Sequence, residues 1–146
     1  MLTKKLIDGL YVEAMLLADE VRAYFDDSGR DARDSLDPMD RVLFSCESLK
    51  VTTRLMHVIA WLLTQRAIDA GEVSVEAMHE PARRLGKAID SEDAVLFRMP
   101  PEASHFVEAS IELYARIERI DSNLLSDLVP HPSPARQLLG RLQQAF

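Results

Sequence analysis

The feature that most constrains this chain is an uninterrupted helical segment between Asp37 and Gly71. Asp37 is a typical helix-capping residue and Pro38 fits the first helical position, while no further Gly or Pro occurs before Gly71. A glycine at that point can end the helix. The pattern predicts one helix of roughly 33 residues, about 50 Å long. Such a helix is either the centre of a bundle or a surface shared between two chains.

Two apolar stripes follow this segment, and together they cover more of its circumference than a surface helix usually buries. We interpret the first as the face of the core, and Cys46 on it as a small core residue. It consists of Val42, Cys46, Leu49, Thr53, Met56, Ala60, Leu63 and Ala67. Because the rest of the chain can cover barely one stripe, we predict that the second forms a homodimer interface. This second stripe consists of Phe44, Val51, Leu55, Val58 and Leu62.

Two other long segments show the same helical period. Residues 3–25 and the segment after Pro101 each carry one apolar stripe, and shorter helical signals lie between and after them. The pattern predicts an all-α fold, an antiparallel three-helix up-down-up bundle with short accessory helices that dimerises through its long helices. We assign residues 1–128 to this bundle domain. Residues 129–146 are interpreted as a Pro-rich linker and a short amphipathic C-terminal helix.

Composition narrows the possible partners. A net charge of −7 argues against nucleic acid or an anionic membrane surface. The single cysteine excludes an internal disulfide and favours a reducing compartment, and no run of about 18 uncharged apolar residues could span a bilayer. The first residues carry charges inside their apolar run, which is unlike a signal peptide. We therefore predict a cytoplasmic protein.

One pattern offers an alternative with metal chemistry. Glu76 and His79, and likewise Glu102 and His105, have the Glu-x-x-His spacing with which helical bundles bind paired metal ions. Glutamates of other helices could complete such a site, namely Glu13, Glu20 or Glu47. Acids near helix starts and ordinary surface histidines explain the same residues without a metal. We favour this second explanation and predict a protein that is not an enzyme and has no cofactor or metal, with the metal-binding bundle as the alternative.

A polar strip on the long helix is a candidate recognition surface. Here cations of an acidic protein lie beside its only tryptophan, and Arg and Trp are enriched at protein interfaces. The strip consists of Lys50, Arg54, His57, Trp61, Gln65 and Arg66. The alternative is structural: Arg54 pairs with acids of a neighbouring helix, Trp61 fills the bundle and His57 is a half-buried histidine. The sequence does not decide between the two.

The C-terminal segment also has two interpretations. Leu138, Leu139 and Leu142 lie on one side of the predicted terminal helix, behind a Pro-rich linker. This helix either folds back onto the bundle or acts as a docking peptide whose apolar face binds a partner's groove. The linker slightly favours docking, so we include the three leucines among the partner-binding residues.

Residues 47–67 also resemble a known family. The runs Thr-Thr-Arg-Leu-Met at 52–56 and Trp-Leu-Leu-x-Gln-Arg-Ala at 61–67 are similar to the central helix of the alphaproteobacterial regulators of CtrA degradation, and the resemblance covers residues 37–80. It implies an all-helical homodimer that is not an enzyme and that acts as an adaptor of the ClpXP protease. The implied partners are the protease primed by a receiver-domain protein, its protein substrates and a cyclic-di-GMP effector. The matching motif positions are Arg54, Trp61, Gln65 and Arg66. A dimeric scaffold unrelated to proteolysis is the remaining alternative.

Overall fold

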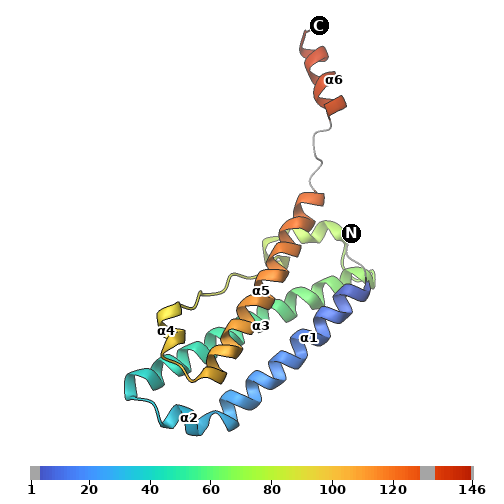
Figure 1. Cartoon of the computed structure of the whole chain (residues 1–146). Helices are drawn as coiled ribbons and strands as arrows, with labels where there is room; N and C mark the ends of the chain where they lie inside the picture. The colour runs from blue at the N-terminus through green and yellow to red at the C-terminus, as the bar shows by residue number, and fades with distance from the viewer. Residues whose placement is uncertain (1–3, 129–133, 146) are drawn as a thin grey trace.

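The computed structural model of this chain describes residues 4–128 and 134–145, and within these residues all regular structure is helical (Figure 1). The predicted all-α class is therefore confirmed. Three long helices dominate: α1 (Lys4–Ala23), α3 (Pro38–Asp69) and α5 (Pro101–Leu128). The shorter helices are the π-helical turn η1 (Tyr24–Ser28), α2 (Arg30–Asp34), the 3-10 turns η2 (Val75–His79) and η3 (Pro81–Arg83), α4 (Asp93–Phe97) and α6 (Pro134–Ala145).

The two ends of α3 lie where the sequence predicts them. Asp37 occupies the N-cap position in an extended conformation, although its side chain makes no capping hydrogen bond. At the other end Gly71 has a φ of 77°, which a residue with a side chain rarely adopts. The Gly71 amide donates to the Ile68 carbonyl at 3.0 Å and the Glu72 amide donates to the Ala67 carbonyl at 2.9 Å. These two bonds form a Schellman motif, which ends the helix.

The core forms where α1 and α5 pack on α3 (Figure 1). The predicted stripes of α1 and α5 both supply core residues, and an aromatic cluster closes one end of the bundle. From α1 the buried residues are Ile7, Leu10, Ala14 and Val21; from α5 they are Ala103, Phe106, Val107, Leu113 and Ile117. The aromatic cluster comprises Tyr24, Phe25, Phe44 and Phe106.

The direction of α5 differs from the predicted up-down-up order. Arg54 donates to Ser110, and Trp61, two turns further along α3, donates to Asp121, further along α5. Residue numbers therefore rise in the same direction, and α5 runs parallel to α3. By contrast, α1 is antiparallel to α3, since Asp8 near its start pairs with Arg66 near the end of α3.

The connection between α3 and α5 explains this difference. The up-down-up prediction treated successive long helices as antiparallel neighbours, as in a simple bundle. Residues 70–100 instead return along the bundle to the starting end of α3, where α5 begins (Figure 1). The 32 residues of α3 measure about 48 Å, which an extended chain covers in roughly 15 residues. We call residues 80–99 the return segment.

The two stripes of α3 exchange the roles that the sequence analysis gave them. Phe44, Val51, Leu55, Val58 and Leu62 are only 0–3% exposed and form the core of the single chain. The prediction that they form a dimer interface is wrong, because α1 and α5 already cover them. The other stripe, predicted to be core, faces away from both helices. None of the described helices is long and apolar enough to cross a membrane.

Candidate protein-interaction surface

The exposed stripe of α3 is the main candidate for a functional surface. Leu49 is 68% exposed and Met56 is 64% exposed, and both project from a helix that is otherwise the centre of the fold. We call this surface the outer stripe, and it consists of Val42, Cys46, Leu49, Thr53, Met56, Ala60 and Leu63, with the half-buried Ala67 at its end. The helical period of the sequence predicts this stripe, but it does not indicate which of the two stripes of α3 the rest of the chain covers.

No charged residue interrupts the outer stripe, although 28% of the chain is charged. Three threonine hydroxyl groups on or beside it bond to the backbone of α3 itself. Thr53 Oγ1 donates to the Leu49 carbonyl at 2.9 Å, and Thr52 and Thr64 donate to the carbonyls four residues earlier at 3.0 Å. These threonines thus satisfy their hydroxyl donors within α3. The surface can bind another protein by burying apolar area.

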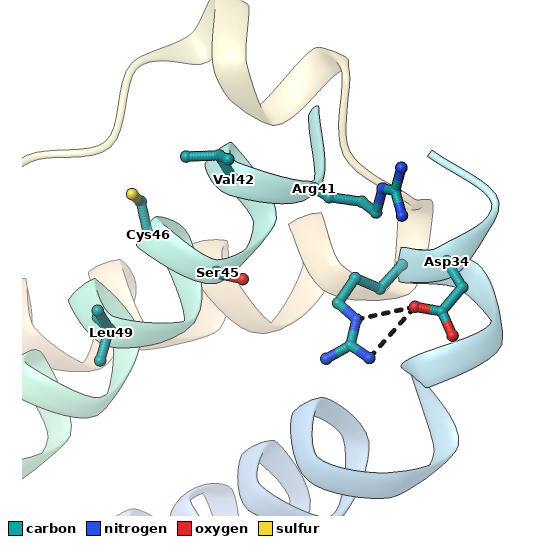
Figure 2. A pocket seen from close by; sticks show the side chains of 7 residues that line it. Asp34, Arg41, Val42, Ser45, Cys46 and Leu49 are labelled. Carbon is teal, nitrogen blue, oxygen red and sulfur yellow. Dashed lines mark hydrogen bonds and ion pairs between the residues drawn. The ribbon is translucent and has the colours of Figure 1, made fainter. Parts of the chain in front are cut away.

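An open hollow lies at the starting end of the outer stripe, between α2 and α3 (Figure 2). Val42, Cys46 and Leu49 form a row along α3 on one side of it. Arg33 contributes from α2, where both Nε and Nη2 lie 3.2 Å from the Asp34 carboxylate. The free thiol of Cys46 is exposed, which corrects the prediction of a core cysteine. The reason is that neither α1 nor α5 covers the stripe that carries Cys46.

The opposite side of α3 carries a buried polar network under the return segment. Arg54 Nη2 donates to Ser91 Oγ at 2.6 Å and to the Ile89 carbonyl at 2.9 Å, while Nη1 donates to Ser110 Oγ at 3.3 Å. Ser91 Oγ in turn donates to the Glu47 carboxylate at 2.5 Å. Burial lowers the pKa of the Arg54 guanidinium, and the negative charges of Glu47 and Asp90 oppose that effect. The network attaches the return segment to α3 and α5.

A second set of contacts attaches the start of the return segment. Trp61 Nε1 donates to Asp121 Oδ1 at 2.9 Å, and Arg84 Nη2 lies 3.4 Å from the other oxygen of that carboxylate. Tyr114 Oη donates to the Gly86 carbonyl at 2.6 Å. A Cβ atom on Gly86 would lie 2.3 Å from the His57 ring, so this close approach requires glycine. The partly buried Tyr114 has a raised pKa, because burial disfavours its charged form.

This arrangement corrects the predicted recognition surface. Arg54 and Trp61 are each 2% exposed, and Gln65 is also buried, with its side-chain amide donating to the Met78 sulfur at 3.2 Å. The structural alternative holds for Trp61, which fills the bundle. Arg54 is also buried, but it bonds to Ser91, Ser110 and the Ile89 carbonyl and forms no ion pair with an acid of a neighbouring helix within the described residues. These residues were mistaken for a surface because the segment that covers them has no helical period. The same unpatterned segment supplies Ser91, which the sequence analysis missed.

Two cations of the predicted strip remain accessible. Lys50 is partly exposed and its ammonium group lies 3.0 Å from the buried Glu47 carboxylate. Arg66 is exposed, pairs with Asp8 at 3.2 Å and stacks over the Tyr11 ring at 4.4 Å from its centroid. Both therefore already have partners within the chain. Glu47 shares a face of α3 with Arg54 at an i, i+7 spacing, which is a signal that could have indicated that both belong to one network.

The four residues of the two Glu-x-x-His spacings all lie at the surface. Glu76, His79, Glu102 and His105 are exposed, and the His105 ring contacts Phe106 edge-on at 5.7 Å between centroids. In the described ranges no three His, Cys, Asp or Glu side chains gather in a way that could hold a metal ion. Of the glutamates proposed to complete the site, Glu13 pairs with Arg116, Glu20 is exposed and Glu47 belongs to the Arg54 network. The structure therefore gives the metal alternative no support.

At the C-terminal end α6 forms as predicted, and Leu138, Leu139 and Leu142 are exposed on it. Figure 1 shows α6 beyond the end of α5, apart from the bundle. The predicted Pro-rich linker at 129–133 lies outside the described residues. An unpartnered apolar face is thus present on α6 as well as on α3.

Comparisons with known proteins bear on both surfaces. A family model described as "Protein of unknown function (DUF1465)" matches residues 1–146. Among solved structures, the chain is similar to the crystal structure of RcdA, the regulator of CtrA degradation, from Caulobacter crescentus. The identity is 31% and the TM-score 0.67, over 84% of this chain and 92% of the other. No curated protein matches the chain.

Proposed function

We propose the following function because this chain belongs to the family of RcdA, the regulators of CtrA degradation. The chain acts as a non-catalytic adaptor in the cytoplasm that helps to deliver selected proteins to the ClpXP protease in cell-cycle-regulated proteolysis. Its partners are the protease, primed by a receiver-domain protein, its protein substrates and a cyclic-di-GMP effector. An adaptor of this kind supplies effective concentration and no chemistry.

The observation that carries this proposal is the outer stripe of α3. An apolar face that carries no charge is costly to leave in water, and contiguous apolar patches typically mark protein-binding sites. The stripe has room for a partner helix along most of α3, because its four larger side chains are 47–68% exposed and α2 borders only its starting end. A binding protein needs such a surface, whereas an enzyme needs a concave site with converging polar groups.

The pattern of the outer stripe favours a second copy as its partner. Its spacings of four and three repeat like the two core positions of a heptad. Larger side chains occupy one position (Val42, Leu49, Met56 and Leu63) and smaller ones occupy the other (Cys46, Thr53, Ala60 and Ala67). Side by side and antiparallel, two copies of α3 place larger residues opposite smaller ones, which lets the layers interdigitate. The facing pairs are Val42 with the other copy's Ala67, Cys46 with Leu63, Leu49 with Ala60 and Thr53 with Met56.

This dimer is tested by placing a charge at the centre of the outer stripe. Met56→Glu would bury two carboxylates without partners at the two-fold axis, which is strongly unfavourable. Light scattering at micromolar concentration should show a dimer for the unmodified chain and a monomer for Met56→Glu. Val12→Glu, at an exposed apolar position of α1, is the matched control and should remain dimeric. A monomeric unmodified chain overturns the dimer.

The adaptor role is tested by a degradation assay with purified ClpXP, the receiver-domain priming protein and candidate substrates from the same cell. Addition of the chain should speed the degradation of at least one substrate and leave the ATPase rate of the protease unchanged. The buried Leu62→Ala variant, used below its unfolding transition, controls for general loss of structure. If none of the substrates is degraded faster, the chain is a dimeric scaffold outside proteolysis.

A further inference from the structure

The short helix α4 carries an exposed aromatic side chain beside unpaired acids. Phe97 is 92% exposed, and Asp93 lies one turn before it on the same face of α4. Glu92 precedes the helix at its N-cap position. Both acids are exposed, and neither has an ion pair within the described residues. We call Glu92, Asp93 and Phe97 the α4 patch. An apolar segment that carries positive charge fits this chemistry.

The C-terminal segment of the chain has the complementary chemistry. Residues 129–146 contain Arg136 and Arg141 and no acid, in a chain whose net charge is −7. Leu138, Leu139 and Leu142 are exposed on α6, and Arg141 is exposed beside them. None of the four has an ion pair or a core contact within the described residues. The apolar face of α6 with Arg141 and the α4 patch are therefore opposite in charge, and neither has a partner within the described residues.

Within one copy the two surfaces are too far apart to meet. The α4 patch lies just before the start of α5, and the ion pair between Arg98 and Asp40 at 2.9 Å joins it to the starting end of α3. Helix α6 follows the other end of α5 (Figure 1). The 28 residues of α5 measure about 42 Å, whereas residues 129–133 span about 17 Å when fully extended.

The proposed dimer removes this separation. Trp61 binds Asp121, and beyond that bond α3 continues to Asp69 and α5 to Leu128, so the two helices end at a similar level. In the antiparallel pairing, Ala67 of one copy faces Val42 of the other. Val42 is close along α3 to Asp40, which binds Arg98 next to Phe97. The end of α5 in one copy therefore lies level with the α4 patch of the second copy.

We propose that α6 of one copy docks onto the α4 patch of the second copy, with its leucines on Phe97 and Arg141 beside Asp93 and Glu92. This inference rests on the proposed dimer through the outer stripe. Each dimer then contains two such contacts, one at each end. Docking keeps the C-terminal leucines out of water and closes the apolar end of the outer stripe near Val42.

Disulfide cross-linking between differently labelled copies tests this contact. Both chains carry Cys46→Ser; one also carries Leu139→Cys and the other, made larger by an affinity tag, carries Phe97→Cys. After mixing and oxidation, a cross-linked product of the summed mass is expected at about tenfold higher yield than with Val12→Cys in place of Phe97→Cys. Equal yields, or no product with Phe97→Cys, overturn the proposal.

Charge variants and light scattering separate this proposal from the dimer itself. Arg141→Glu should lower the cross-linking yield several-fold, and Asp93→Arg in the other chain should restore it. Arg119→Glu, at an exposed arginine of α5, makes the same charge change and should leave the yield unaltered. If the chains are dimers but the yield does not respond to Arg141→Glu, α6 docks elsewhere and the adaptor proposal stands. If the chains are monomers, both the dimer and the docking proposal fail.

Discussion

The inner and outer faces of α3 belong to one helix but differ in whether the rest of the chain covers them. The inner face holds Glu47, Arg54 and Trp61, each hydrogen-bonded to another part of the same chain. The outer face holds Leu49 and Met56, and no described residue of the chain covers them. Two charged residues of α3, Glu47 and Arg54, are thus buried where the chain covers the helix, and several of its apolar residues are exposed where the chain does not cover it.

This difference shows how one face of a helix can stabilise the fold while its other face remains free to bind another protein. Buried polar groups demand specific partners, so they fix where the return segment lies. An uncharged exposed face makes no such demand within the chain and remains available to another protein. The outer stripe is therefore the part of α3 that is expected to act between molecules, while the inner face acts within one.

The largest expected effect removes the buried cation of the inner face. Arg54→Met removes the donor to the Ser91 and Ser110 hydroxyls and the Ile89 carbonyl, together with a positive charge near the buried Glu47 carboxylate, and should lower the free energy of unfolding by about 3–5 kcal/mol. Urea denaturation followed by circular dichroism measures this change. The control is Arg66→Met, which removes an exposed cation of the same helix and should cost no more than about 1 kcal/mol. Equal losses would contradict the difference between the two faces.

Two adjacent leucines give the sharpest test of the comparison. Leu62 is 0% exposed and Leu63 is 47% exposed, and both are well inside α3. Leu62→Ala should cost about 2–5 kcal/mol at every protein concentration, because it leaves a cavity in the core. Leu63→Ala should have little effect on the unfolding of dilute protein but should weaken dimerisation. Denaturation midpoints measured over a hundredfold range of concentration distinguish the two. A concentration-independent loss for Leu63→Ala would mean that its own chain covers it.

The smallest effect concerns the attachment of the return segment at Tyr114. Tyr114→Phe removes the hydrogen bond to the Gly86 carbonyl and should cost about 1 kcal/mol at neutral pH. Because burial raises the pKa of Tyr114 above 10.0, this tyrosine keeps its proton longer in the folded chain than in the unfolded one. Its stabilising effect is complete below about pH 10 and is lost as the pH rises above it. Denaturation between pH 8 and 11 should therefore show a shallower alkaline decline for Tyr114→Phe than for the unmodified chain.

The parts of the fold that depend on local signals could be predicted from the sequence. Asp37, Pro38 and Gly71 set the limits of α3 through backbone geometry that neighbouring residues decide. The apolar stripes of α1 and α5 also agree with the core, although α1 exposes further apolar side chains such as Val12 and Leu16. The membership of the family, inferred from residues 47–67, is confirmed by the similarity to RcdA.

The parts that depend on which segments meet could not be predicted. Helix α3 has two apolar stripes of similar strength, and periodicity alone does not say which one α1 and α5 cover. The direction of α5 depends on the path of residues 70–100, and a segment without regular period gives no direction. The same segment conceals Arg54 and Trp61, so their burial and their partners followed from its path and could not be inferred from the composition of α3.

The parallel order of α3 and α5 affects how this protein must be made. A bundle of successive hairpins can assemble as each helix leaves the ribosome, whereas here the bond between Trp61 and Asp121 joins residues far apart in the chain. Until synthesis has reached Asp121, α1 and α3 form an incomplete core whose side toward α5 is open to chaperones and proteases. The growing chain is consequently most vulnerable to degradation just before its third long helix is finished.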